Sequence, residues 1–169
     1  MPNPSREARA LITALFLVAG YAVISPFLYE AQRLLPPQLG SPDWRLGAGG
    51  FLLEALTTPT LGLAAALALA WYDERWGLMR LVAWTAILGS VATVVVWALF
   101  LREFLAMRPG VPEVGRGVYD AASMRSLVIG GLSAPILLLL GVSGRRLASI
   151  RSAEDRARER GIVVPSGSA

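Results

Sequence analysis

Residues 51–71 of the chain are FLLEALTTPTLGLAAALALAW, an apolar run that contains a single charged residue, Glu54. A helix needs about 20 mostly apolar residues to cross the roughly 30 Å hydrocarbon layer of a membrane. Because a chain in lipid must satisfy its own backbone hydrogen bonds, a spanning segment of this length is expected to be helical. This run therefore predicts a transmembrane helix.

Three further runs of the same kind lie at residues 8–28, 81–101 and 122–143. The chain has 169 residues, 54% of them hydrophobic and 17% charged, and its mean hydropathy is +0.54. We predict an all-α integral membrane four-helix bundle, residues 1–143, followed by a tail at 144–169. The first run follows Arg6 and Arg9 like a signal peptide, but its apolar residues continue to Leu28, which favours an uncleaved span.

The distribution of arginine predicts how the protein is oriented in the membrane, because short loops on the cytoplasmic side carry an excess of positive charge. All 16 basic residues are arginine. Six lie in the two loops expected outside or at the start of the fourth span, and the other ten lie at the two termini and in the turn at 72–80. The six are Arg33, Arg45, Arg102, Arg108, Arg116 and Arg125. We therefore expect both termini in the cytoplasm of a bacterial cell, with the protein in its inner membrane.

The connections differ in composition. Each outer loop is rich in proline and glycine and is expected to hold about 20 residues of irregular chain, with 47–50 as a flexible entry to the second span. The inner connection, residues 72–80, is expected to be a tight polar turn. The tail is predicted to form a short amphipathic helix over 144–161 with mixed charge, and a frayed end at 162–169.

Small residues mark one face of the second and fourth spans. Helices in lipid associate by close packing at small side chains, so these faces are predicted to pack against neighbouring helices. The leucines of the second span, including Leu53, Leu63 and Leu67, are expected to face lipid or a partner subunit. The predicted helix-packing residues are Gly62, Ala66, Ala70, Ser126, Gly130 and Ala134.

Two prolines, Pro59 and Pro135, lie within the second and fourth spans. Each removes a backbone hydrogen bond and favours a kink, unless a nearby hydroxyl satisfies the freed carbonyl group. Their sequence contexts match in register, which suggests two duplicated hairpins. The alternative is that they are two independent prolines in apolar helices, where proline is common.

Glu54 is the candidate functional residue, because an ionisable group inside a membrane is costly. In one interpretation it is a proton-binding or cation-binding carboxylate, with the Thr57 and Thr58 hydroxyl groups beside it and Arg125 as its partner. In the other, Glu54 forms a structural ion pair with Arg125 or with Arg45.

Other charges have simpler interpretations. Asp43 to Arg45 either orient the loop over Glu54 or anchor the interface, and Arg102 and Glu103 are expected to be solvated caps. Arg145 and Arg146 either bind anionic lipid or only set the topology.

The chain contains no histidine and no cysteine, which excludes histidine-ligated or cysteine-ligated metal or haem. We predict no metal, no other cofactor, no catalytic residues and no nucleic-acid partner, although a pigment, quinone or lipid held by packing alone stays open. We expect a non-enzymatic accessory or scaffold subunit that packs against other membrane proteins or against copies of itself. The alternative is a small-solute or ion carrier that uses the polar site near Glu54, and a membrane enzyme is the third hypothesis.

Overall fold

The computed structural model describes residues 6–159, apart from the side chains of residues 33, 155 and 157–159. This part of the chain is helical throughout except for short connections, which confirms the all-helical class. The elements are α1 (Arg6–Leu34), α2 (Pro42–Glu54), α3 (Thr57–Tyr72), α4 (Trp76–Met107), the 3-10 helix η1 (Arg108–Gly110) and α5 (Glu113–Glu159).

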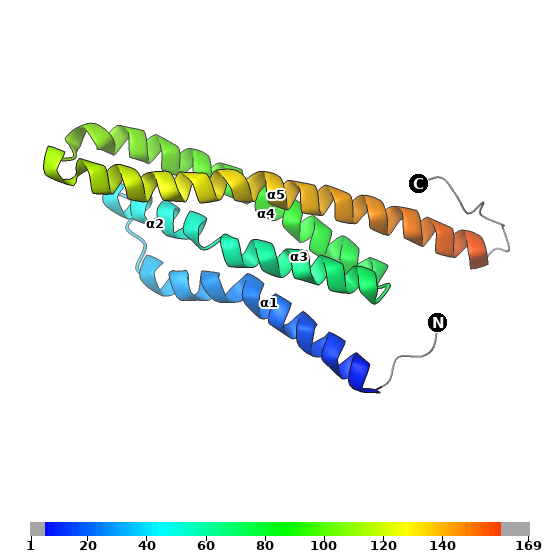
Figure 1. Ribbon diagram of the computed structural model, residues 1–169. Coiled ribbons are helices and arrows are strands. Elements are labelled where there is room, and N and C mark those ends of the chain that lie inside the picture. The colour runs from blue at the N-terminus through cyan, green and yellow to red at the C-terminus, as the bar shows by residue number, and fades with distance from the viewer. Residues whose placement is uncertain (1–5, 160–169) are drawn as a thin grey trace.

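The helices lie side by side in an elongated bundle (Figure 1). Helices α4 and α5 form an antiparallel hairpin with the most extensive contact, α3 packs along this hairpin, and α1 packs mainly on α3. The start of α1, the α3–α4 turn and the last turns of α5 lie at one end of the bundle, which we call the terminal end. The α1–α2 connection and η1 lie at the other end, which we call the hairpin end.

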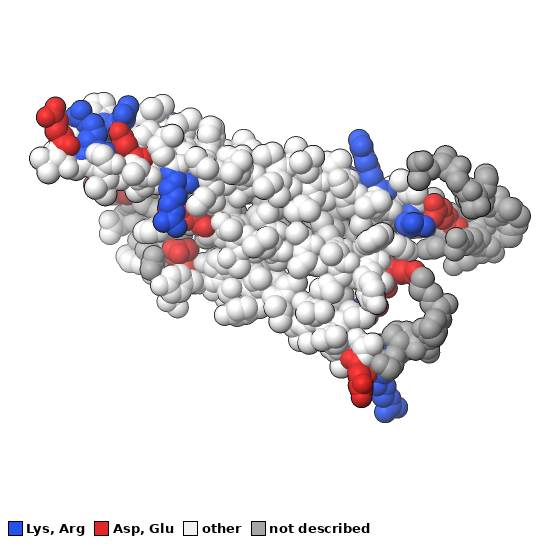
Figure 2. Space-filling model, viewed as in Figure 1, with Lys and Arg blue, Asp and Glu red and all other residues white. Residues whose placement is uncertain are grey.

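Four segments are long and apolar enough to cross a membrane, as the sequence predicts. They are Arg6–Gln32, Pro42–Tyr72, Trp76–Gly110 and Glu113–Glu154, so α2 and α3 together make one segment. In the view of Figure 2, charged side chains gather at the two ends and leave a broad uncharged band between them. Large apolar side chains stay exposed along the helices, among them Leu17, Leu88 and Leu139.

The first predicted loop is mostly helical, which corrects the expected 20 residues of irregular chain. Helix α1 continues to Leu34 and α2 begins at Pro42, so only residues 35–41 connect them. The Ser41 hydroxyl caps α2 by accepting a hydrogen bond from the Trp44 N–H at 3.3 Å. Proline suits the first helical position, because its missing N–H has no partner there. Ser41 and Pro42 therefore begin a helix.

Residues 47–50 lie inside α2 and are not a flexible entry. A Cβ added to Gly49 would lie 3.1 Å from Cδ2 of Phe100 on α4, and one added to Gly50 would lie 3.3 Å from Cε2 of the same ring. Glycine at these positions therefore lets α2 approach the Phe100 ring closely.

The second predicted loop is also short. Helix α4 continues to Met107 and η1 is followed by α5 from Glu113. The Arg108 guanidinium group forms two hydrogen bonds with the Asp120 carboxylate, at 3.0 and 2.9 Å. The rings of Phe104 and Tyr119 stack with centroids 5.5 Å apart. These contacts join η1 and the last turn of α4 to the first turns of α5.

The α3–α4 turn is tight, as predicted, but it spans only residues 73–75 of the expected 72–80, because α4 begins at Trp76. Helix α3 ends with two backbone hydrogen bonds, from the Glu74 N–H to the Trp71 carbonyl group and from the Arg75 N–H to the Ala70 carbonyl group. This pattern is a Schellman motif, in which the residue after the C-cap adopts a left-handed conformation. That residue is Glu74, with φ 53°, where glycine is the usual choice.

The two prolines have different effects on their helices. Pro59 has no N–H, so the Ala55 carbonyl group loses its donor, and α2 is separated from α3 at Ala55 and Leu56. The Thr60 hydroxyl donates to the Leu56 carbonyl group at 2.8 Å. In contrast, α5 passes through Pro135 without interruption. This difference favours two independent prolines over duplicated hairpins.

Residues 144–159 continue α5, whereas we predicted a separate short helix. Helix α5 has 47 residues, which at 1.5 Å per residue is about 70 Å, more than twice the thickness of a hydrocarbon layer. Figure 1 shows it passing beyond the α3–α4 turn at the terminal end. The Arg151 side chain donates to Glu154 at 3.1 Å. The predicted frayed end, 162–169, lies outside the described residues.

The buried residues of α4 and α5 are mostly small, and most of them recur at intervals of three or four residues. This period is typical of helices that stay in contact along their whole length. Among the hydrogen bonds that join the helices, the Ser90 hydroxyl donates to the Ala134 carbonyl group at 2.7 Å, and the Trp97 indole donates to the Leu127 carbonyl group at 2.9 Å. The buried set on α5 is Ser123, Ser126, Gly130, Ser133, Ala134, Leu137, Gly141, Gly144 and Ala148.

Helix α3 is buried on two faces, because it lies between α1 and the α4–α5 hairpin. A Cβ on Gly62 would lie 2.9 Å from the Ala19 carbonyl oxygen of α1, so α3 approaches α1 closely at Gly62. On another face, Leu63 is 7% exposed and packs with Ala86 and Leu137 of the hairpin. The expectation that the leucines of this span face lipid is therefore wrong for Leu63, and also for Leu53 and Leu67.

Candidate functional site

Glu54 is the last residue of α2 and lies beside the helix break. Its side chain is 34% exposed. The Ser126 hydroxyl lies 3.1 Å from Glu54 Oε1 and 3.3 Å from the Ala122 carbonyl oxygen, and its one proton serves one acceptor at a time. The Arg125 Nε lies 3.8 Å from the same carboxylate oxygen, an ion-pair distance that is too long for a hydrogen bond. Glu54 is therefore held by two consecutive residues of α5.

A cavity of about 230 Å³ lies beside Glu54, between α2, α4 and α5. Phe100, Tyr119 and Ser123 contribute to its wall. Gly50 allows this close arrangement, because a Cβ there would lie 3.3 Å from the Phe100 ring and 3.5 Å from the Ser126 hydroxyl. The site thus combines one carboxylate and hydroxyl groups with aromatic walls.

The structure brings together only part of the predicted site. Glu54 and Arg125 meet, as one interpretation of the sequence requires. Thr57 and Thr58 lie beyond the helix break, are exposed and are absent from the lining of the cavity. The helix is interrupted just after Glu54, so Thr57 and Thr58 do not continue the helical face on which Glu54 lies.

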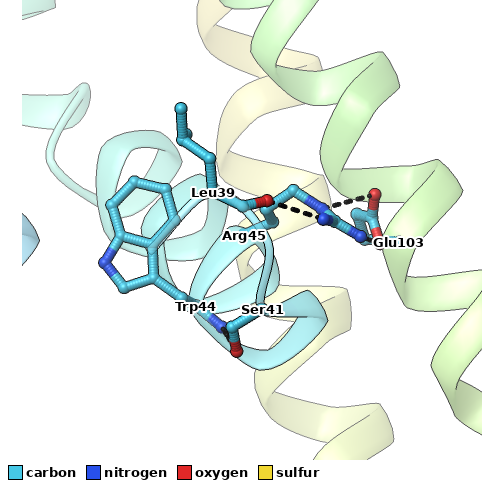
Figure 3. A network of polar contacts seen from close by, with 5 residues as sticks. All are labelled: Leu39, Ser41, Trp44, Arg45 and Glu103. Carbon is cyan, nitrogen blue, oxygen red and sulfur yellow. Dashed lines mark hydrogen bonds and ion pairs between the residues drawn. The ribbon is translucent and has the colours of Figure 1, made fainter. Parts of the chain in front are cut away.

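Arg45 has a different partner from the one proposed for it, Glu54. Its guanidinium group forms two hydrogen bonds with Glu103 of α4, at 3.1 and 3.3 Å, and a third with the Leu39 carbonyl oxygen at 2.7 Å. Figure 3 shows Arg45 between these two acceptors, next to the Ser41 cap of α2. Glu103, whose side chain is 14% exposed, is thus a partner of α2, which corrects its assignment as a solvated cap.

The six residues predicted for helix packing are all buried, and they contact different helices. Gly62 packs on α1, as described above, and Ala70 joins a cluster with Met79, Ala83 and Ala148 of the α4–α5 hairpin. Gly130 accommodates Leu53, since a Cβ there would lie 2.6 Å from Leu53 Cδ2. The others are Ala66, Ser126 and Ala134.

Sequence reasoning missed the hydrogen bond between Ser126 and Glu54. The signal was present, because Ser126 lies next to Arg125 and on the small-residue face of its span. The small-residue face predicts packing alone for Ser126. The carboxylate, the hydroxyl and the guanidinium group together form one polar cluster beside the cavity. Among the described residues, no group of three or more His, Cys, Asp or Glu side chains is arranged to hold a metal ion.

Comparison of the chain with protein-family models, with curated proteins and with solved structures gives no significant match.

Proposed function

We propose that the chain is a multi-pass protein of the bacterial inner membrane that crosses it four times, with the terminal end in the cytoplasm. Four apolar segments and the uncharged band of Figure 2 support the insertion. Arginines of the turn and of the last turns of α5 lie at the terminal end, and an excess of arginine favours the cytoplasmic side.

Cysteine labelling tests this orientation, because the chain has no cysteine of its own. Gly77 and Gly110 lie at opposite ends of the bundle, and a side chain at either position meets open space. In intact cells, a membrane-impermeant maleimide is expected to label Gly110→Cys and to label Gly77→Cys only after permeabilisation. The reverse pattern would contradict the orientation, and labelling of both without permeabilisation would contradict the insertion.

Within that membrane we propose a non-enzymatic accessory or scaffold subunit that packs against partner membrane proteins. The observation that supports this role is that polar side chains form hydrogen bonds between helices. Ser90 and Trp97 join α4 to α5, Arg45 joins α2 to Glu103 of α4, and Ser126 holds Glu54. Such bonds suit a rigid frame, and the length of α5 lets that frame extend beyond the bilayer.

Native mass spectrometry after gentle extraction from the membrane tests the subunit role. The expected result is recovery of the chain at fixed stoichiometry in a larger assembly with other membrane proteins. Recovery of the chain with lipid alone, as a monomer or as a homo-oligomer, would contradict this proposal. Turnover of a substrate by the purified chain would contradict it as well.

A second candidate function is an ion carrier, which the surroundings of Glu54 favour. Interrupted membrane helices often place ion-binding groups at the break, and Glu54 lies at the break between α2 and α3 beside a cavity. In proteoliposomes under an imposed potential, the carrier is expected to move protons or Na⁺, and Glu54→Gln to abolish the flux. Glu113→Gln, which removes an exposed charge elsewhere, is the matched control. Unchanged flux in Glu54→Gln would remove this residue from the mechanism.

A further inference from the structure

A second cavity, of about 500 Å³, lies between α4 and α5 near the terminal end. We call it the arginine cleft. Its polar side is formed by Arg80 of α4 and by Arg145, Arg146 and Ser149 of α5, and its apolar side by Trp84, Ile87 and Val142. The site at Glu54 lies toward the opposite end of the bundle, so the two sites are separate.

The positive charge of the cleft is not neutralised by the described part of the chain. The ion pairs of that part involve other arginines, and no acidic residue lines the cleft. Arg80 donates to the Ser152 hydroxyl, and the Arg145 guanidinium carbon lies 4.0 Å from the centroid of the Trp84 ring. Both contacts orient an arginine and leave its charge available.

The apolar side of the cleft points along the helices toward the uncharged band. Trp84 and Ile87 follow Arg80 by one and two helical turns, and Val142 precedes Arg145 by about one turn. Trp84 and Val142 are partly exposed, at 47% and 36%. In Figure 2 the blue side chains at this end border the uncharged band. The cleft is therefore cationic toward the terminal end and apolar toward the middle.

We propose that the arginine cleft binds the headgroup of an anionic phospholipid, with an acyl chain along Trp84, Ile87 and Val142. Guanidinium groups suit phosphate oxygens, because their donors form paired hydrogen bonds with them. Basic pockets between membrane helices on the cytoplasmic side suit such headgroups, and tryptophan suits the depth of the interface. A soluble phosphate would gain nothing from the apolar side. The inference rests on the proposed membrane insertion.

The test uses the purified full-length chain in detergent with phosphatidylglycerol and phosphatidylcholine of identical acyl chains. Native mass spectrometry is expected to show preferential retention of phosphatidylglycerol by the wild type. In Arg80→Gln/Arg145→Gln the preference is expected to fall about fivefold for each arginine, the factor that corresponds to about 1 kcal/mol per residue near a membrane surface. No preference in the wild type would overturn the proposal.

Arg151→Gln/Arg156→Gln is the matched control, since it also removes two positive charges, but from residues of α5 that do not line the cleft. It is expected to keep the preference. An equal loss in both double variants would show a general effect of charge and overturn the site. Glycerophosphate is the soluble probe: if it displaces phosphatidylglycerol at equal concentration, the cleft is a site for soluble phosphate and the assignment to lipid fails.

Quenching of tryptophan fluorescence locates the lipid, and it tests the proposal even if the arginine variants do not fold. Phosphatidylglycerol with brominated acyl chains is expected to quench the wild type more than it quenches Trp84→Phe, whereas brominated phosphatidylcholine should show a smaller difference. Equal quenching of the two proteins by brominated phosphatidylglycerol would place the lipid elsewhere. If the membrane proposal itself fails, the maleimide should label Gly77→Cys and Gly110→Cys alike without permeabilisation.

Discussion

Replacing Gly141 with alanine adds a methyl group where α5 lies against the backbone of α4. The new Cβ would lie 2.5 Å from Ile87 Cγ1, 2.7 Å from the Ala83 carbonyl oxygen and 3.0 Å from the Ile87 nitrogen. Ordinary contacts of a Cβ begin near 3.4 Å. The Ile87 side chain can rotate away, but two of the three atoms belong to the α4 backbone. We therefore expect the variant to push α4 and α5 apart.

The expected loss of stability combines two opposing terms. Overpacking a well-packed interior destabilises by about 1–3 kcal/mol, and replacing glycine by alanine within a helix stabilises by about 1 kcal/mol. The steric term is the larger over most of this range, so Gly141→Ala should lower the free energy of unfolding by up to about 2 kcal/mol. Gly20→Ala in α1 is the matched control, since a Cβ there meets nothing within 4 Å. It should cause no loss.

Unfolding in mixed micelles with increasing SDS, followed by far-ultraviolet circular dichroism, measures both variants. Their difference isolates the steric term and should be about 1–3 kcal/mol. Adding Ile87→Ala to Gly141→Ala should restore only part of the loss, because the backbone atoms stay in place. Equal unfolding free energies for Gly141→Ala and Gly20→Ala would refute the close approach of α4 and α5.

Three further changes test contacts elsewhere in the bundle by the same unfolding measurement. Glu74→Gly should raise the stability by up to about 1 kcal/mol, since glycine adopts a left-handed conformation without steric cost; a loss larger than that of Glu74→Ala would argue against the Schellman motif. Arg45→Gln and Glu103→Gln should each destabilise, and a double-mutant cycle should give a coupling of about 0.5–3 kcal/mol, whereas additive effects would mean that the pair contributes nothing. Ser90→Ala should cost about 0.5–1.5 kcal/mol for the bond to Ala134, and a neutral result would show that this bond adds no stability.

The amino-acid sequence by itself determined the helical class, the four segments and the small-residue faces of the bundle. These properties are local, because the length of an apolar run and a spacing of three or four residues can be read without knowing which helices are neighbours. The tight turn between α3 and α4 belongs to the same group. The prediction that Glu54 contacts Arg125 is confirmed. Both residues lie in the part of their span that is near the hairpin end of the bundle.

The tertiary structure decided which polar groups meet and which helix faces are buried. Glu54 and Ser126 are 72 residues apart in sequence, and Arg45 and Glu103 are 58 apart. Their pairing depends on the order and the rotation of the helices, which periodicity does not specify. Leu63 is buried for the same reason, since α3 lies between α1 and the α4–α5 hairpin.

The connections at the hairpin end show the same dependence. Their proline and glycine content suggested irregular chain, but glycine in a helix loses about 1 kcal/mol relative to alanine, a small term that packing readily offsets. The Phe100 ring of α4 supplies that packing against Gly49 and Gly50. Composition alone therefore sets a weak local preference, and contacts between distant residues determine whether the chain follows it.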